Sequence, residues 1–294
     1  MRTSGSRLPA FHGTGVALVT PFTPDLAVDY AGWRHLLDFC IEGGVEYVVV
    51  NGTTGESPTT TAAERKELLR MAVEHVAGRV PLMYGIGSND TVAAVELLRE
   101  TDLAGVAAIL SASPAYNKPS QAGLVAHYTY LAEASPLPIV LYNVPGRTAS
   151  NLTAETTLRL AHHPNIMGIK EASGNMEQCL VIAARKPANF LLLSGDDMLT
   201  PALIACGAEG AISVLANAFP RRFSDLTRAA LAGDFAAARE GLFKLLPLNP
   251  LMYEESNPVG VKAALAALGV CGAAVRLPLL EATGGLKERI QKLL

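Results

Sequence analysis

The chain has 294 residues, is 50% hydrophobic and carries a formal net charge of −3. This composition is too apolar for a disordered protein, and the length is sufficient for one large core or two domains. Because there is neither a basic block nor an acidic tail, nucleic acid and anionic membrane surfaces are not expected partners.

Eight short apolar runs rich in Val, Ile and Leu recur along the chain without alternating with polar residues. Near-continuous apolar runs are typical of strands covered on both faces, as in a parallel sheet. The runs span residues 15–20, 45–50, 80–86, 106–110, 138–143, 166–170, 190–195 and 211–214.

Segments with helical periodicity lie between these runs. The clearest of them are 62–76, 90–103, 121–134 and 154–162. Short polar side chains that can accept hydrogen bonds from the first turn precede the helices. The predicted N-caps are Asp29, Thr61, Asn89, Ser120 and Thr153.

Strand followed by helix, repeated eight times in roughly 230 residues, predicts a closed (β/α)8 TIM barrel. A doubly wound open sheet is the alternative, but no GxGxxG follows the first strand. Beyond the last strand, helices are predicted over 235–246, 259–268 and 283–294. We therefore divide the chain into a barrel catalytic domain, residues 1–233, and a C-terminal helical domain, residues 234–294. The second domain shows no chemical motif, and we expect it to serve packing or oligomer contact.

Neither a membrane span nor a secretory signal is expected. Every long apolar run is interrupted before about 18 residues, the minimum for a transmembrane helix. The N-terminal stretch MRTSGSRLPAFHGTG lacks the apolar middle of a signal peptide. The cysteines Cys40, Cys179, Cys206 and Cys271 stand alone, without metal-ligand spacing, which favours reduced residues in a cytoplasmic protein.

The active site of such a barrel lies at the C-terminal ends of its strands. Lys170 ends the apolar run IMGIK. Burial favours the neutral form of an amine, and a neutral amine attacks a ketone or aldehyde to form a Schiff base. An ion pair with Glu171 is the alternative interpretation of this lysine.

Hydroxyl groups that could move protons around Lys170 follow neighbouring strands. Tyr142 ends the preceding strand, so its hydroxyl is expected to reach the lysine, although a core tyrosine bonded to backbone is the alternative. Thr53 and Thr54 lie in the Gly-rich turn NGTTGESP (51–58), whose backbone N–H groups can hold a carboxylate. There is no P-loop sequence and no cluster with metal-ligand spacing, so we expect neither nucleotide nor metal.

Six motifs together resemble the dihydrodipicolinate synthase family, part of the N-acetylneuraminate lyase superfamily of class I aldolases. They cover the chain from about residue 12 in the order of the family. The motifs are GTTGES (52–57), SPAYNKPSQ (113–121), YNVPGRT (142–148), GIKEASG (168–174), SGDD (194–197) and NPVGVKAAL (257–265). Any one of them alone is a weak signal, whereas the set is specific.

The resemblance implies roles for the candidate residues. Lys170 would form the Schiff base with pyruvate, and Tyr142, Thr54 and Tyr116 would form a proton relay. Tyr116 would reach in from a neighbouring subunit, and Thr53 and Thr54 would hold the pyruvate carboxylate.

The resemblance also implies the second substrate. Arg147 would bind the carboxylate of aspartate semialdehyde with its planar guanidinium, and Gly195 and Ile212 would line the pocket. The expected product is 4-hydroxy-tetrahydrodipicolinate, on the diaminopimelate route to lysine. No metal, nucleotide or organic cofactor is expected, and the implied assembly is a cytoplasmic homotetramer, a dimer of tight dimers.

Two other functions are alternatives. A pyruvate-dependent aldolase or dehydratase acting on a sugar acid such as N-acetylneuraminate would leave Arg147 without its role. Sialic-acid lyases of the superfamily typically lack this arginine and carry GSTGE, so Arg147 with GTTGE favours the synthase. A catalytically inactive barrel that binds a keto acid would be expected to lose Lys170 or Tyr142, and both are present.

One departure from the family bears on regulation. Ala115 stands where many members carry a tyrosine that packs across the tight dimer interface. Ala62, Arg65 and Ala93 stand where lysine-sensitive members carry histidines and a glutamate of an effector pocket. We hypothesise that lysine inhibits this protein weakly or not at all.

Overall fold

The computed structural model describes residues 11–294. Eight parallel strands form a closed barrel in chain order, and the last strand pairs with the first. The strands are β1 (Gly13–Ala17), β2 (Tyr47–Val50), β3 (Leu82–Gly85), β4 (Ala108–Ala112), β5 (Ile139–Asn143), β6 (Ile166–Glu171), β7 (Leu191–Ser194) and β8 (Gly210–Ser213). The predicted (β/α)8 barrel is therefore confirmed, and β1–β8 pairing excludes the open sheet.

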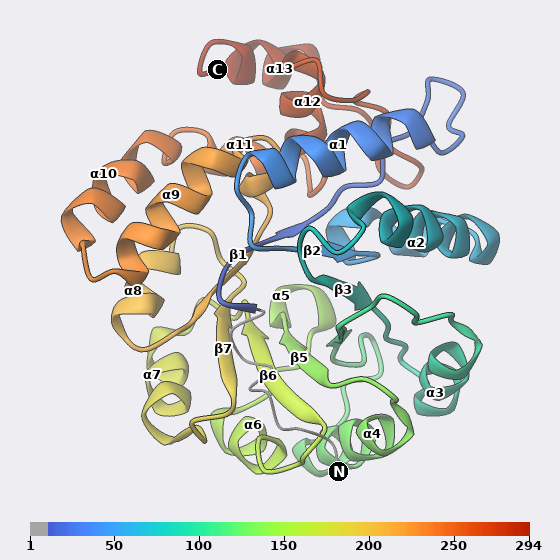
Figure 1. Ribbon diagram of the computed structural model, residues 1–294, viewed down its shortest axis with the longest axis vertical. Helices are drawn as coiled ribbons and strands as arrows, with labels where there is room; N and C mark the ends of the chain where they lie inside the picture. The colour runs from blue at the N-terminus through green and yellow to red at the C-terminus, as the bar shows by residue number, and fades with distance from the viewer. Residues whose placement is uncertain (1–10) are drawn as a thin grey trace.

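Helices surround the barrel, and further helices follow the last strand (Figure 1). The first group is α1 (Tyr30–Glu42), α2 (Ala62–Val76), α3 (Thr91–Glu100), α4 (Gln121–Ala134), α5 (Pro145–Thr148), α6 (Ala154–Leu160), α7 (Met176–Arg185), α8 (Thr200–Ala205) and α9 (Pro220–Leu231). The second group is α10 (Phe235–Leu245), α11 (Asn249–Tyr253), α12 (Val259–Ala267) and α13 (Gly284–Gln291). Three 3-10 turns, η2 (Thr53–Gly55), η3 (Ser57–Thr59) and η4 (Leu215–Asn217), lie in the loops after β2 and β8.

The helix starts follow the predicted caps with one exception. Thr61 forms a capping box with Glu64 at the start of α2. The prediction of Asn89 as the cap of α3 is wrong, because the next residue has that role. Asp90 Oδ1 accepts hydrogen bonds from the amides of Val92 (2.8 Å) and Ala93 (3.3 Å).

One apolar core fills the inside of the barrel. It is built from inward-facing side chains of the strands, among them Val49, Met83, Val140, Leu193 and Ile212. Tyr47 crosses the interior, and its hydroxyl donates to the carbonyl of Ala211 at 3.0 Å. Residue 15 must be glycine because a Cβ there would lie 2.1 Å from the Tyr47 ring. The interior is therefore a packed core and not a channel.

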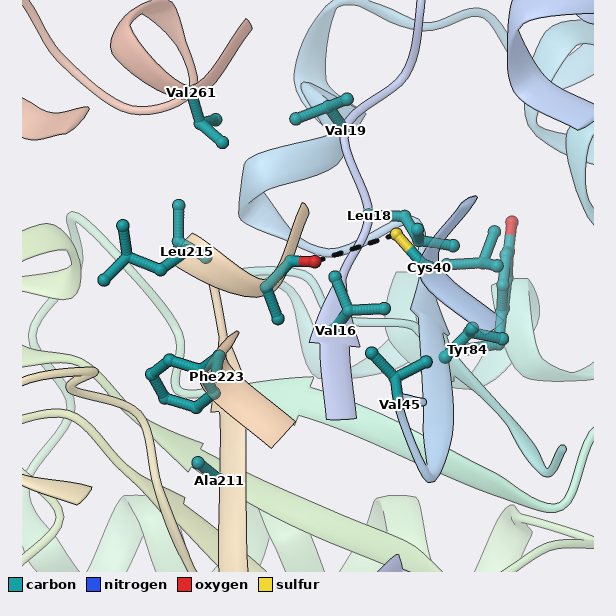
Figure 2. Packing of buried hydrophobic residues seen from close by; sticks show 14 of the residues in the cluster. Val16, Leu18, Val19, Cys40, Val45, Tyr84, Ala211, Leu215, Phe223 and Val261 are labelled. Carbon is teal, nitrogen blue, oxygen red and sulfur yellow. Dashed lines mark hydrogen bonds between the residues drawn. The ribbon is translucent and has the colours of Figure 1, made fainter. Parts of the chain in front are cut away.

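A second, larger core lies between the strands and the helices (Figure 2). Val16, Leu18, Leu215 and Phe223 belong to it, and Cys40 Sγ approaches the carbonyl oxygen of Ala216 at 3.8 Å. The four cysteines predicted to be reduced are all free thiols. Both cores together hold the strand ends, and hence the site, in fixed positions.

The C-terminal helices lie against the start of the barrel. In Figure 1, α12 and α13 lie near α1, and His35 Nδ1 of α1 is 3.0 Å from the carbonyl oxygen of Val270. A short turn around residue 233 separates α9 from α10. We propose this turn as the boundary between the barrel domain, residues 1–233, and the helical domain, residues 234–294.

Candidate active site

Lys170 lies inside the C-terminal mouth of the barrel. It is the penultimate residue of β6 and not the last as predicted, because the strand continues to Glu171. Tyr142 is its register partner on β5. Only 4% of Lys170 is exposed. Its Nζ lies 4.3 Å from the centroid of the Tyr142 ring, so an aromatic face covers the amine.

The neighbouring Glu171 points away from the site, since successive residues of a strand face opposite sides. Its carboxylate accepts hydrogen bonds from Asn143 Nδ2 (2.9 Å) and Gln178 Nε2 (2.8 Å). The amide of Ser173 also donates to it, at 2.7 Å. Within residues 11–294, Lys170 takes part in no ion pair. The alternative of a Lys170–Glu171 ion pair is therefore not found, and the amine is left for chemistry.

Space for the lysine stem comes from the strand that follows in the barrel. Gly195 directly follows β7, and a Cβ there would lie 3.0 Å from Lys170 Cε and 2.7 Å from Ala172 Cβ. Ile212 is fully buried on β8 as part of the interior core. Both residues thus lie at the barrel mouth or in its interior, and Gly195 is adjacent to Lys170.

The two threonines after β2 begin the turn η2. Thr54 is buried, and its Oγ1 accepts a hydrogen bond from Asn257 Nδ2 at 3.0 Å. Thr53 is half-buried and lines a cavity of about 430 Å³ together with Tyr142. The turn therefore presents one hydroxyl group to the cavity and one to the C-terminal segment.

This cavity opens at the ends of β2 to β5. Its lining includes Thr53, Arg65, Asn89, Ala115 and Tyr142, and Arg65 is the one charged residue among the described residues that line it. Lys170 does not line the cavity, and Tyr142 connects the two because its ring lies against the amine. A molecule in the cavity would therefore meet Tyr142 before it meets Lys170.

Arg147 is exposed on the short helix α5, directly after β5. Within residues 11–294 its side chain makes no hydrogen bond or ion pair. Burial raises the pKa of the Tyr253 hydroxyl, and the negative charges of Asp197 and Asp196 raise it further, while Arg147 opposes them. Arg147 is thus free to bind an anion, close to a tyrosine that the sequence did not single out.

A polar network holds the loop that carries Arg147. The amide of Leu152 donates to Asn143 Oδ1 at 2.9 Å, and Asn143 Nδ2 donates to Asn151 Oδ1 at 2.8 Å. Asn143 also bonds to Glu171, the residue after Lys170. The loop of Arg147 and the strand of Lys170 are therefore fixed relative to each other.

Tyr116 is a predicted site residue that the single chain leaves in solvent. Its side chain is 88% exposed in the loop after β4. Its φ of 73° lies in the left-handed region that residues other than glycine seldom adopt. The loop thus holds a large aromatic side chain in solvent.

Two features are missing from residues 11–294. No group of three or more His, Cys, Asp or Glu side chains could hold a metal ion. No helix in this range has the length and apolar character needed to cross a membrane.

Comparison with known proteins agrees with this geometry. A sequence model described as the dihydrodipicolinate synthetase family matches residues 10–294. A protein of Cytophaga hutchinsonii named 4-hydroxy-tetrahydrodipicolinate synthase is 50% identical, over 96% of this chain and 95% of its own.

Solved structures are similar over the same length. A dihydrodipicolinate synthase from Acinetobacter baumannii, described as complexed with pyruvate, is 37% identical with a TM-score of 0.93, over 96% of this chain and 97% of its own. A structure described as a monomeric dihydrodipicolinate synthase variant is 36% identical with a TM-score of 0.95, over 98% of this chain and 97% of its own.

Proposed function

The chain belongs to the dihydrodipicolinate synthetase family, and from this premise we propose how its residues perform the reaction. The enzyme condenses pyruvate with aspartate 4-semialdehyde to give 4-hydroxy-tetrahydrodipicolinate, in the diaminopimelate route to lysine. We assign the Schiff base to Lys170. The observation that carries this assignment is its buried amine, which forms no ion pair with the residues that the structure describes and lies 4.3 Å from the Tyr142 ring centroid.

The first half of the reaction joins pyruvate to Lys170. The amine attacks the ketone carbon, and the carbinolamine loses water to give an imine. The protonated imine withdraws electrons, so the pyruvate methyl group loses a proton and an enamine forms. Lys170 itself thus supplies the electron sink that the carbon–carbon bond formation needs.

The second half joins the two substrates. The enamine carbon attacks the aldehyde carbon of aspartate semialdehyde, and the aldehyde oxygen takes a proton to become a hydroxyl group. The amino group of the product then attacks the imine carbon and displaces Lys170. This step closes the ring and regenerates the free amine.

Each step moves a proton, and hydroxyl groups around Lys170 are our candidates for moving it. Tyr142 lies against the amine, and Thr54 lies in the turn after β2. We propose that Thr53 and Thr54 of this turn also bind the pyruvate carboxylate. Gly195 and Ile212 would shape the pocket. Tyr116, exposed in one chain, would complete the relay in a second copy, which makes a dimer the smallest active unit.

The proposed assembly is a homotetramer of two such dimers in the cytoplasm. The exposure of Tyr116 supports the dimer contact. Ala115 beside it is smaller than the tyrosine of many relatives and buries less area. We therefore expect the tetramer to dissociate at higher concentrations than those of relatives with the tyrosine, and sedimentation over a dilution series measures this.

Arg147→Ala should weaken the binding of aspartate semialdehyde and leave the reaction with pyruvate unaffected. A hydrogen bond to a charged group contributes roughly 1.5–3 kcal/mol, so kcat/KM for aspartate semialdehyde should fall about 10- to 100-fold. Trapping of pyruvate by borohydride should proceed as in the unmodified enzyme. A coupled assay with varied aspartate semialdehyde measures the change.

Arg159→Ala is the matched control, because Arg159 is also exposed, on the neighbouring helix α6. It should leave both substrates unchanged. Equal losses of kcat/KM for aspartate semialdehyde in the two variants would show that Arg147 does not bind this substrate. Loss of pyruvate trapping in Arg147→Ala would mean that the arginine acts on the first substrate.

Lysine should inhibit the enzyme weakly or not at all. Among residues 11–294, no carboxylate lines the cavity that holds Ser57, Arg65, Asn89 and Ala115, so the lysine ammonium group would lack a partner. Arg65 Nη1 instead donates to the carbonyls of Ser57 (3.2 Å) and Thr60. Initial rates with increasing lysine test this, and half-maximal inhibition at sub-millimolar lysine would contradict it.

A further inference from the structure

The cavity at the ends of β2 to β5 carries one positive charge. Its volume is about 430 Å³, and Arg65 is the one charged residue among its described lining residues. Cavities of this size hold small organic molecules. An anion is therefore the kind of ligand whose charge complements this cavity.

Arg65 has hydrogen-bonding capacity left over in this cavity. It lies on α2, and its Nη1 donates to the carbonyl oxygens of Ser57 (3.2 Å) and Thr60. Among residues 11–294, its Nε and Nη2 have no hydrogen-bond partner and the guanidinium forms no ion pair. Nε and Nη2 form one edge of the planar group, which can donate two parallel hydrogen bonds to a carboxylate. Backbone carbonyls thus hold Arg65 in place while this edge stays open to a ligand.

A tyrosine hydroxyl group is a second donor in the same cavity. Tyr84 on β3 is buried and lines the cavity, and its hydroxyl group has no hydrogen-bond partner within residues 11–294. Burial raises the pKa of Tyr84 to about 12, although the positive charge of Arg65 opposes the rise. The hydroxyl group is therefore protonated at neutral pH and can donate to an anion.

The rest of the lining indicates what the body of the ligand is. Ile86 and Leu110 are buried apolar side chains of the cavity wall. Ser57 and Asn89 add uncharged polar side chains, which bond to no other described residue. No carboxylate lines the cavity within residues 11–294, so an amino group on the ligand would find no charged partner. The lining thus fits a small organic acid with a short aliphatic body.

We propose that this cavity is a second ligand site, which binds a small aliphatic carboxylate through Arg65 and Tyr84. It is separate from the pyruvate site, because Lys170 does not line it. Tyr142 belongs to both, since it lines the cavity and its ring centroid lies 4.3 Å from the Lys170 amine. A bound acid contacts this ring and should slow turnover. The effect on turnover rests on the proposed function, whereas the binding itself does not.

Butyrate binding to enzyme that carries the reduced pyruvate adduct tests the site, because the adduct fills the pyruvate site. A titration followed by saturation-transfer NMR should detect butyrate on this enzyme. Arg65→Gln should weaken the binding about 10- to 100-fold and Tyr84→Phe about 10-fold, since each loses a hydrogen bond to a charged group. Tyr84→Phe removes only a hydroxyl group, so it carries the test if Arg65→Gln fails to fold.

Three matched controls accompany the titration. Lys66→Gln removes a neighbouring exposed charge of α2 that does not line the cavity, and it should bind butyrate normally. Arg147→Ala should also bind normally, which separates this site from that of aspartate semialdehyde. Butylammonium has a similar aliphatic body with the opposite charge, and it should not bind. Pyruvate is an acid of the same class, and tighter binding of pyruvate than of butyrate would identify the substrate as the ligand.

Turnover supplies a second readout. Butyrate should inhibit the unmodified enzyme even at saturating pyruvate, and Arg65→Gln should need at least about tenfold more butyrate for the same inhibition.

Three results would overturn the inference. These are equal butyrate affinity in Arg65→Gln, Tyr84→Phe and the unmodified enzyme, equal binding of butylammonium, and no butyrate binding once the adduct is formed. Failure of the proposed function is separate, since the protein would then form no pyruvate adduct and convert no aspartate semialdehyde. In that case the same titrations are made on the unmodified protein, where binding that does not depend on Arg65 would overturn the inference.

Discussion

Lys170→Met should abolish turnover while leaving the fold intact. Methionine fills a similar volume without an amine, so the barrel mouth stays packed but no imine can form. Removal of a covalent nucleophile lowers the rate by a factor on the order of 10⁴ or more. The coupled assay with pyruvate and aspartate semialdehyde measures the loss, and a thermal melt within experimental error of the unmodified enzyme shows that the fold is retained.

The matched control is Lys186→Met. Lys186 is another mostly buried lysine, with its side chain 10% exposed, but it is paired with Glu209 at 2.5 Å. This variant should keep its activity even if its stability falls. If Lys170→Met and the unmodified enzyme had comparable turnover, Lys170 would not be the residue that forms the Schiff base.

Of the substitutions predicted here, Lys262→Met should lower the free energy of unfolding most. The side chain of Lys262 is fully buried and that of Glu56 is 2% exposed, so the change leaves a carboxylate buried without its partner. Burial lowers the pKa of the Lys262 ammonium group, and the Glu56 carboxylate opposes this effect. Breaking a buried pair on one side costs about 3–5 kcal/mol in the free energy of unfolding. Denaturant titration followed by circular dichroism measures the difference.

Lys244→Met is the control for this prediction, because the Lys244–Glu240 pair is mostly exposed, at 67% and 72%. It should change the free energy of unfolding by less than about 1 kcal/mol. Adding Glu56→Gln to Lys262→Met removes the unpaired charge and should recover part of the loss. If Lys262→Met and Lys244→Met lowered the free energy of unfolding equally, the buried ion pair would stabilise the fold no more than the exposed one.

Local sequence signals are sufficient to predict much of the fold. The helices predicted over 62–76 and 121–134 have these bounds in the structure, because Thr61 and Ser120 cap them with their own side chains. Each of the eight apolar runs overlaps a strand, since the strands of a closed parallel barrel are covered on both faces. At α3 two adjacent residues could cap the helix, and periodicity could not choose Asp90 over Asn89.

The site was predictable where the residue follows a strand, and not where a distant segment supplies the contact. Lys170 and Tyr142 come together because neighbouring parallel strands place their ends side by side. Asn257 and Lys262 contact residues more than 200 positions away, which no local pattern encodes. A lysine inside the apolar run VGVKAAL was the one available signal, since a buried charge requires a partner.

The most direct test of the Schiff-base mechanism is the intact mass of the enzyme after incubation with pyruvate and sodium borohydride, followed by peptide mapping. We predict one reduced pyruvate adduct per chain, located on Lys170 and missing from Lys170→Met. An adduct on another lysine, or no adduct under conditions of full turnover, would contradict the Schiff-base mechanism assigned to Lys170.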